Sequence, residues 1–213
     1  MKLTQVYMTL EELEYEPLVR ARYQYVANYL TLFVSDWLKE LKLDLGTFNR
    51  FVFQEGYHED MSIVGDKAFR ICVKPEFTSM EKFTSSEFTH CYFVRKYLEG
   101  FSKIDQKFGL NLEDELRQKM KLKFEGGYKY DAKAKSKKVG KVIVQLLHRY
   151  QFDRYKLVFQ CIDHCKNVQD EKVIFESEPD PFTVHFDINK IEIDEHKVRV
   201  FNKIRQEHLL VEL

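Results

Sequence analysis

The sequence predicts an α+β fold in which several amphipathic helices pack on a mainly antiparallel sheet and the chain ends in a β-meander. Apolar residues recur every three or four positions through much of the first 150 residues, and from residue 155 they alternate with polar ones. Gly and Pro are scarce, at 8 and 4 of 213 residues, which leaves little room for long linkers. Helices that precede a run of strands are typical of this class.

Size and composition predict one globular domain over residues 1–213, with a soft subdivision near 109–131. Hydrophobic residues make up 44% and charged residues 32%, which is typical of folded proteins. The N-terminus lacks the apolar core of a signal peptide, and the longest apolar stretch, residues 25–34, is too short to span a bilayer. We therefore expect a cytoplasmic protein with no membrane partner.

The N-terminal part predicts a helix and a hairpin. Residues 9–12 match a capping box for a short turn, and a long amphipathic helix is expected over 17–43, with Pro17 in its first turn. Residues 48–54 and 67–75 have the alternation of half-buried strands, so they are expected to form a hairpin with an extended loop.

The middle of the chain predicts three more helices. One covers residues 86–108 and ends at Gly109, and another begins after Asn111, which suits a helix N-cap. A fourth is expected over 132–150, because the apolar residues between Val139 and Tyr150 fit one helical face.

The C-terminal part predicts five short strands joined by brief turns, which is typical of an antiparallel meander. The expected strands are residues 155–162, 172–178, 182–188, 190–194 and 197–201. The tail, 207–213, fits either a sixth strand or the end of a helix.

The cysteines favour neither a metal site nor a disulfide. Cys161 and Cys165 are about 13 Å apart along an extended chain, so they could bind one zinc ion only if the chain turned sharply between them. Cys91 lies on the apolar stripe of a predicted helix, while His90 points about 100° away from it. We expect free thiols, no metal and no cofactor.

Enzyme chemistry is not visible in the sequence. Cys72 shares a polar strand face with Arg70 and Lys74, which would lower its pKa, but no base accompanies it. Phosphate-binding loops and known nucleophile motifs are absent from the sequence. A non-enzymatic protein is predicted, and an enzyme whose site residues are scattered along the chain stays an alternative.

Charge is distributed unevenly along the chain. Residues 117–156 hold 13 Lys and Arg against 3 Asp and Glu, a formal charge of +10 in a chain of net charge 0. On the predicted helix over 132–150, Lys133, Lys137 and Lys141 would stack along one face, although like charges at that spacing destabilise a helix. The ridge is either an anion-binding surface or an ordinary solvated face.

Two surfaces are therefore candidates for binding. The first is the basic segment 128–141, in which Tyr128 and Tyr130 are available to stack on a ligand. The second is the outer face of the C-terminal sheet, where His185 and Asp187 share one strand face.

These surfaces predict a protein that binds another protein, and a toxin-neutralising immunity protein is the concrete version. The first alternative is a nucleic-acid- or anion-binding module that uses residues 128–141.

Overall fold

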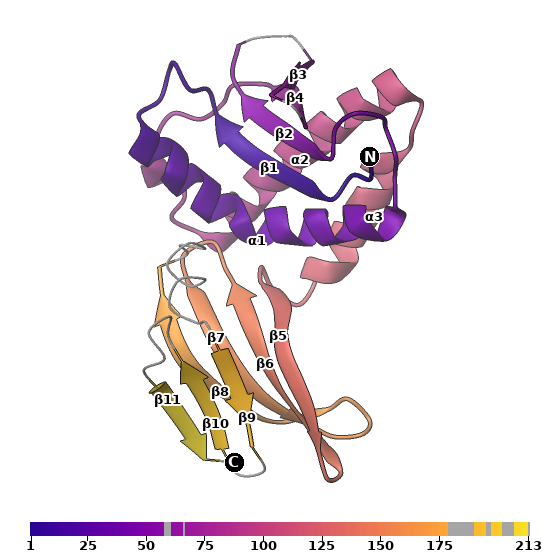
Figure 1. The fold of residues 1–213 in the computed structure, drawn as a ribbon. Coiled ribbons are helices and arrows are strands. Elements are labelled where there is room, and N and C mark those ends of the chain that lie inside the picture. The colour runs from indigo at the N-terminus through magenta and orange to yellow at the C-terminus, as the bar shows by residue number, and fades with distance from the viewer. Residues whose placement is uncertain (58–60, 66, 179–189, 195–196, 202–206, 213) are drawn as a thin grey trace. The chain divides into compact units, whose positions relative to one another are not determined.

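The computed structural model describes residues 1–57, 61–65, 67–178, 190–194, 197–201 and 207–212 (Figure 1). The chain forms two compact units, Met1–Lys129 and Tyr130–Leu213. Their boundary falls at the end of the predicted subdivision near 109–131, and the expectation of a single domain stays a prediction. The α+β class and the C-terminal meander are confirmed.

The N-terminal unit contains a four-stranded sheet of order β1-β2-β4-β3. Its strands are β1 (Gln5–Leu10), β2 (Arg50–Glu55), β3 (Ser62–Val64) and β4 (Ala68–Val73). The strands β1, β2 and β4 are parallel, and the short β3 is antiparallel to β4.

Two expectations for this unit are wrong. Residues 9–12 are not a helical capping box, because Thr9 and Leu10 complete β1. Segments 48–54 and 67–75 are not a hairpin: the chain returns through β3 before it enters β4, so β4 runs in the same direction as β2.

The helices of this unit are α1 (Pro17–Leu41), α2 (Ser86–Phe108) and α3 (Leu112–Phe124), with a 3-10 turn η1 (Met80–Lys82). The ends of α2 agree with the prediction, since the Ser85 hydroxyl accepts a hydrogen bond from the Phe88 N–H and Gly109 adopts a left-handed conformation with φ of 67°. Helix α1 connects the parallel strands β1 and β2, as a crossover must.

The core of the N-terminal unit lies between the helices and one face of its sheet. Phe51 and Phe53 of β2 pack edge-on against Phe101 of α2, with ring centroids 6.1 and 5.1 Å apart. Gly100 permits this approach, because a Cβ at its position would lie 3.0 Å from the Phe53 ring. Ser35 of α1 hydrogen-bonds the outer edge of β1, where its hydroxyl accepts from the buried Val6 N–H at 3.0 Å.

The C-terminal unit is built from antiparallel strands throughout its described residues. One sheet has the order β5-β6-β7-β8 and the other β11-β10-β9. Their bounds are β5 (Tyr130–Val139), β6 (Val142–Tyr150), β7 (Tyr155–Ile162), β8 (Val168–Ser177), β9 (Lys190–Ile193), β10 (Lys197–Phe201) and β11 (Glu207–Glu212).

The predicted helix over 132–150 is wrong, since this segment forms the hairpin of β5 and β6. Gly140, with φ of 58°, permits the two-residue turn at Gly140 and Lys141. The run Val142–Val144 is β-branched and suits a strand. The ambiguous tail is a strand, β11, and the expected strand over 182–188 lies outside the described residues.

Candidate functional site

The hairpin of residues 130–150, called the basic hairpin here, carries most of the predicted site. It contains six Lys and Arg and a single acidic residue, Asp131, so its formal charge is +5. Five exposed lysines are spread over its first strand and its turn: Lys133, Lys135, Lys137, Lys138 and Lys141.

These lysines do not form the single ridge expected from a helix. A β-bulge between Lys133 and Lys135 shifts the register, so Lys133 pairs with Leu147 whereas Lys137 pairs with Val144. Leu147 and Val144 are three residues apart on β6, so they point to opposite faces of the sheet, and so do their partners. Positive charge therefore surrounds β5 on both faces, and Lys141 adds to it at the turn.

Asp131, the acidic residue of the basic hairpin, forms an ion pair with Arg149. Arg149 donates to both carboxylate oxygens of Asp131 at 2.8 and 2.9 Å, and to both oxygens of Glu171 on β8 at 2.6 and 3.1 Å. The hydrogen bonds that Arg149 donates to Asp131, and then those that it donates to Glu171, raise its pKa. Asp131 therefore forms its ion pair with Arg149.

Tyr128 and Tyr130, predicted as stacking residues, belong to different units. Tyr128 stacks on His90 with ring centroids 4.4 Å apart, inside the N-terminal unit. His90 also hydrogen-bonds the Tyr29 hydroxyl through Nδ1 at 3.0 Å, and burial lowers its pKa to about 4. Tyr130 opens β5 opposite Tyr150.

The second predicted surface is described only in part. His185 and Asp187 lie outside the described residues. In the described part of the C-terminal unit, a shallow depression of about 310 Å³ is lined by Lys135, Glu192, Asp194 and Arg199. Its mixed charges resemble an ordinary solvated sheet face, because Lys190 already pairs with Glu192 and lowers its pKa.

Two expectations about the cysteines are wrong. Cys91 is exposed, because the buried side of α2 runs through Tyr92 and Phe93 instead. Cys72 is buried, because the last three residues of β4 are all covered. Neither thiol therefore has the environment that the sequence indicated.

Cys161 and Cys165 flank a tight turn. Asp163 Oδ1 accepts hydrogen bonds from the backbone N–H groups of Cys165 and Asn167, at 2.8 and 2.9 Å. Cys161 is half-buried and Cys165 is exposed. Within the described ranges, His, Cys, Asp and Glu side chains form no group of three or more that could hold a metal ion.

A buried charge pair in the N-terminal unit was not predicted. Lys96 Nζ of α2 lies 3.5 Å from the Glu55 carboxylate at the end of β2, and both side chains are only 1% exposed. Tyr23 and Tyr92 donate their hydroxyl hydrogen bonds to Glu55, as do the backbone N–H groups of residues 76 and 77. The one feature of the sequence that could have indicated this pair is Lys96, a charged residue on the buried side of α2.

This pair belongs to a closed hydrogen-bond network. The Lys96 ammonium donates to the Lys74 carbonyl oxygen and lies 3.5 Å from Glu76, while Arg95 also pairs with Glu76. The phenol of Tyr23 has a raised pKa, mainly because it is buried and then because Glu55 is negative. The Glu55 carboxylate accepts four hydrogen bonds, so its main effect is to tie β2, α1 and α2 together.

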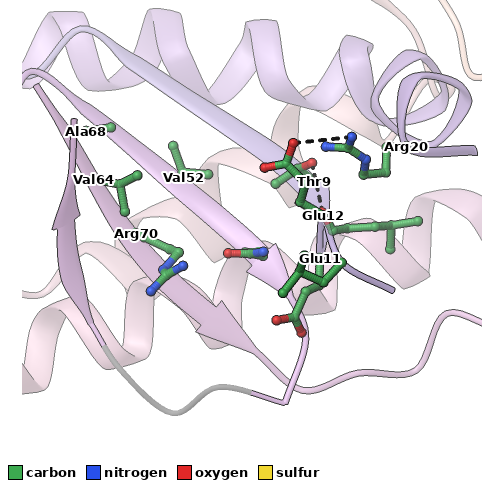
Figure 2. Close-up of a pocket in the computed structure, with 11 residues that line it drawn as sticks. Thr9, Glu11, Glu12, Arg20, Val52, Val64, Ala68 and Arg70 are labelled. Carbon is green, nitrogen blue, oxygen red and sulfur yellow. Dashed lines mark hydrogen bonds and ion pairs between the residues drawn. The ribbon is translucent and has the colours of Figure 1, made fainter. Parts of the chain in front are cut away.

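A pocket of about 460 Å³ lies on the other face of the N-terminal sheet (Figure 2). Residues from the end of β1, the start of α1 and the strands β2, β3 and β4 line it. Arg20 pairs with Glu12 at 3.5 Å, and Arg70 donates to the Ser62 hydroxyl at 3.1 Å. The pocket is open and of mixed charge, so it can hold a polar ligand but does not select one sign of charge.

Comparison of this chain with protein-family models, with curated proteins and with solved structures finds no match. Among the described residues, no helix is both long and apolar enough to cross a lipid bilayer.

Proposed function

We propose that this protein is not an enzyme and acts by binding another protein that presents an acidic surface, with the basic hairpin as the contact. The observation that supports this most strongly is the set of five exposed lysines on both faces and the turn of one hairpin. Neutralisation of a toxin by an immunity-type inhibitor is the concrete form of the proposal.

Electrostatics of this kind acts mainly on the rate of association. A surface of one sign attracts a partner of the opposite sign before contact and orients it, which raises association rates by about 10- to 1,000-fold at low salt. Because the lysines are exposed, their charges add little to the stability of the free protein.

The lysines also have a structural explanation, and the test must distinguish it from partner binding. Charged side chains on the edge strand of a sheet prevent it from pairing with another chain, and Lys is the commonest choice. A charge of either sign provides this protection, whereas only positive charge attracts an acidic partner. Charge reversal therefore distinguishes the two roles.

The test compares two triple variants in the full-length protein. Lys133→Glu, Lys137→Glu and Lys141→Glu reverse the basic hairpin, and Lys67→Glu, Lys119→Glu and Lys121→Glu are the matched control, since these lysines are exposed in the N-terminal unit. Partners are captured from a lysate of the native cells on the immobilised wild type and identified by mass spectrometry. Association rates are then measured with the purified partner.

We expect the hairpin variant to associate at least about tenfold more slowly at low salt, with a weaker salt dependence, and the control to be unchanged. Equal rates for the wild type and the hairpin variant would show that the lysines only protect the edge. If the wild type instead captures nucleic acid, and the logarithm of its affinity falls linearly with the logarithm of the salt concentration, a nucleic-acid-binding module would be favoured.

A further inference from the structure

The strand β5 is an edge strand of unusual length. It is first in the order β5-β6-β7-β8 and has 10 residues, against about 5–6 in a typical strand. Figure 1 shows it at the margin of its sheet, with β6 beside it. Among the described strands, β6 is the one that is hydrogen-bonded to it.

An edge of this kind offers backbone groups to a ligand. Along an antiparallel strand, the N–H and C=O groups of alternate residues point toward the same neighbour. About half of the backbone groups of β5 therefore point away from β6, toward the side on which an extended peptide would add a further strand.

We propose that an extended acidic segment of the partner adds to the edge of β5 as a new strand of this sheet. This proposal rests on the proposed function and specifies its mode of binding. Lys135 and Lys137 lie on one face of β5, and Lys133 and Lys138 on the other. A strand with carboxylates on both of its faces would bring negative charge to both faces of this lysine-bearing edge.

The same charges argue against a second copy of β5 as the occupant. Two β5 strands paired edge to edge would bring eight lysines together, and like charges that face each other across strands are destabilising. The lysines thus select an acidic strand while they reject self-pairing.

The strand β8 of a second copy is a weaker candidate for a related reason. It is the other edge of this sheet and it is acidic, but its carboxylates already have cationic partners. Glu171 is bound to Arg149, and Glu176 to Arg154 and Lys156, at 2.6 to 3.3 Å. Pairing with β5 would have to compete with these contacts.

The experiment uses synthetic ten-residue peptides built from Val-Thr-Glu-Glu repeats, which place glutamates on both faces of a strand. The full-length protein is titrated with the parent peptide and with two analogues, N-methylated at odd or at even residues. N-methylation removes an N–H donor and leaves the charge unchanged. Hydrogen exchange of the β5 amides is followed with and without the parent peptide.

Strand addition predicts an asymmetric result. One methylated analogue should bind at least about tenfold more weakly than the parent and the other should bind almost as well, because alternate N–H groups face β5. The outward amides of β5 should exchange more slowly with the peptide bound. The variant with Lys133→Glu, Lys137→Glu and Lys141→Glu should no longer bind the parent peptide.

Other results overturn the proposal. If both analogues bind as well as the parent, the contact is made by charge alone, and the proposed function survives without strand addition. If the parent binds the wild type no better than the charge-reversed variant, strand addition fails, while the partner kinetics still decide the proposed function. A dimer in sedimentation that Asp170→Lys dissociates would identify β8 of a second copy as the occupant.

Discussion

Replacing Lys96 with Met should destabilise the N-terminal unit by about 3–5 kcal/mol. The substitution keeps the length of the side chain but leaves the Glu55 carboxylate, which is 1% exposed, without its cation 3.5 Å away. A charge stranded in this way typically carries a cost of about 3–5 kcal/mol. The hydrogen bonds that Tyr23 and Tyr92 donate to the carboxylate remain and still stabilise its negative charge, so the unit is expected to fold.

A double-mutant cycle separates the ion pair from the packing around it. Glu55→Gln alone should also be destabilising, because it removes the buried partner of the Lys96 ammonium and leaves it with the partly exposed Glu76 carboxylate, 3.5 Å away. In the double variant neither charge is left, so its loss of stability should be smaller than the sum of the single losses by about 2 kcal/mol. Lys39→Met is a control, since Lys39 is half-exposed beside Asp36 and such pairs contribute at most about 1 kcal/mol.

Trp37 makes the measurement specific to one unit. It is the single tryptophan of the chain and is buried against Phe101 of α2, with centroids 5.5 Å apart. Its fluorescence in a urea titration therefore reports unfolding of the N-terminal unit, and an unchanged slope against urea would show that the unfolded state is unaffected. A loss below about 1 kcal/mol for Lys96→Met, or strictly additive single losses, would refute this account.

Three further predictions follow from contacts in the two units. The pKa of His90 is about 4 in the folded chain and about 6.5 in the unfolded chain, so His90 should make stability decrease as the pH falls from 6.5 toward 4. Allowing for the partial exposure of the ring, His90→Gln should remove about 1–2 kcal/mol of that decrease, as measured by urea titrations at each pH. Arg149→Met should destabilise the C-terminal unit by about 2–3 kcal/mol and Arg149→Lys by less, measured by circular dichroism, because Lys cannot form two bidentate contacts; equal losses would contradict the geometry. Gly100→Ala should destabilise the N-terminal unit by about 1–3 kcal/mol in the Trp37 assay, since its Cβ would press on the Phe53 ring, and an unchanged midpoint would mean that the ring can move aside.

Local sequence signals were sufficient to predict an element where residues within that element determine its ends. The predicted bounds of α2 agree with the structure because Ser85 and Gly109 act within one turn of the helix ends. The strands β7 and β10 were predicted for the same reason, since alternation along five to eight residues is a property of the segment itself.

The segment 132–150 shows where such signals become ambiguous. The apolar residues of β6 satisfy a helical spacing and a strand spacing about equally. The lysines of β5 are ambiguous too, because Lys133, Lys135 and Lys137 alternate as in a strand, whereas Lys133 and Lys137 are four residues apart as on a helical face. Pairing with β7, which lies beyond the segment, buries Val144 and Leu146 and decides in favour of a strand. Propensity alone is too weak to outweigh such a contact.

The candidate sites divide in the same way. The sequence was enough to show that residues 117–156 are basic and that a binding function at this segment is a reasonable hypothesis, because charge content does not depend on the fold. The direction of each lysine depended on the bulge in β5, and a register is set by the neighbouring strand. The contact between Glu55 and Lys96 joins residues 41 positions apart in the chain, so only tertiary packing could bring these two charges together and bury them.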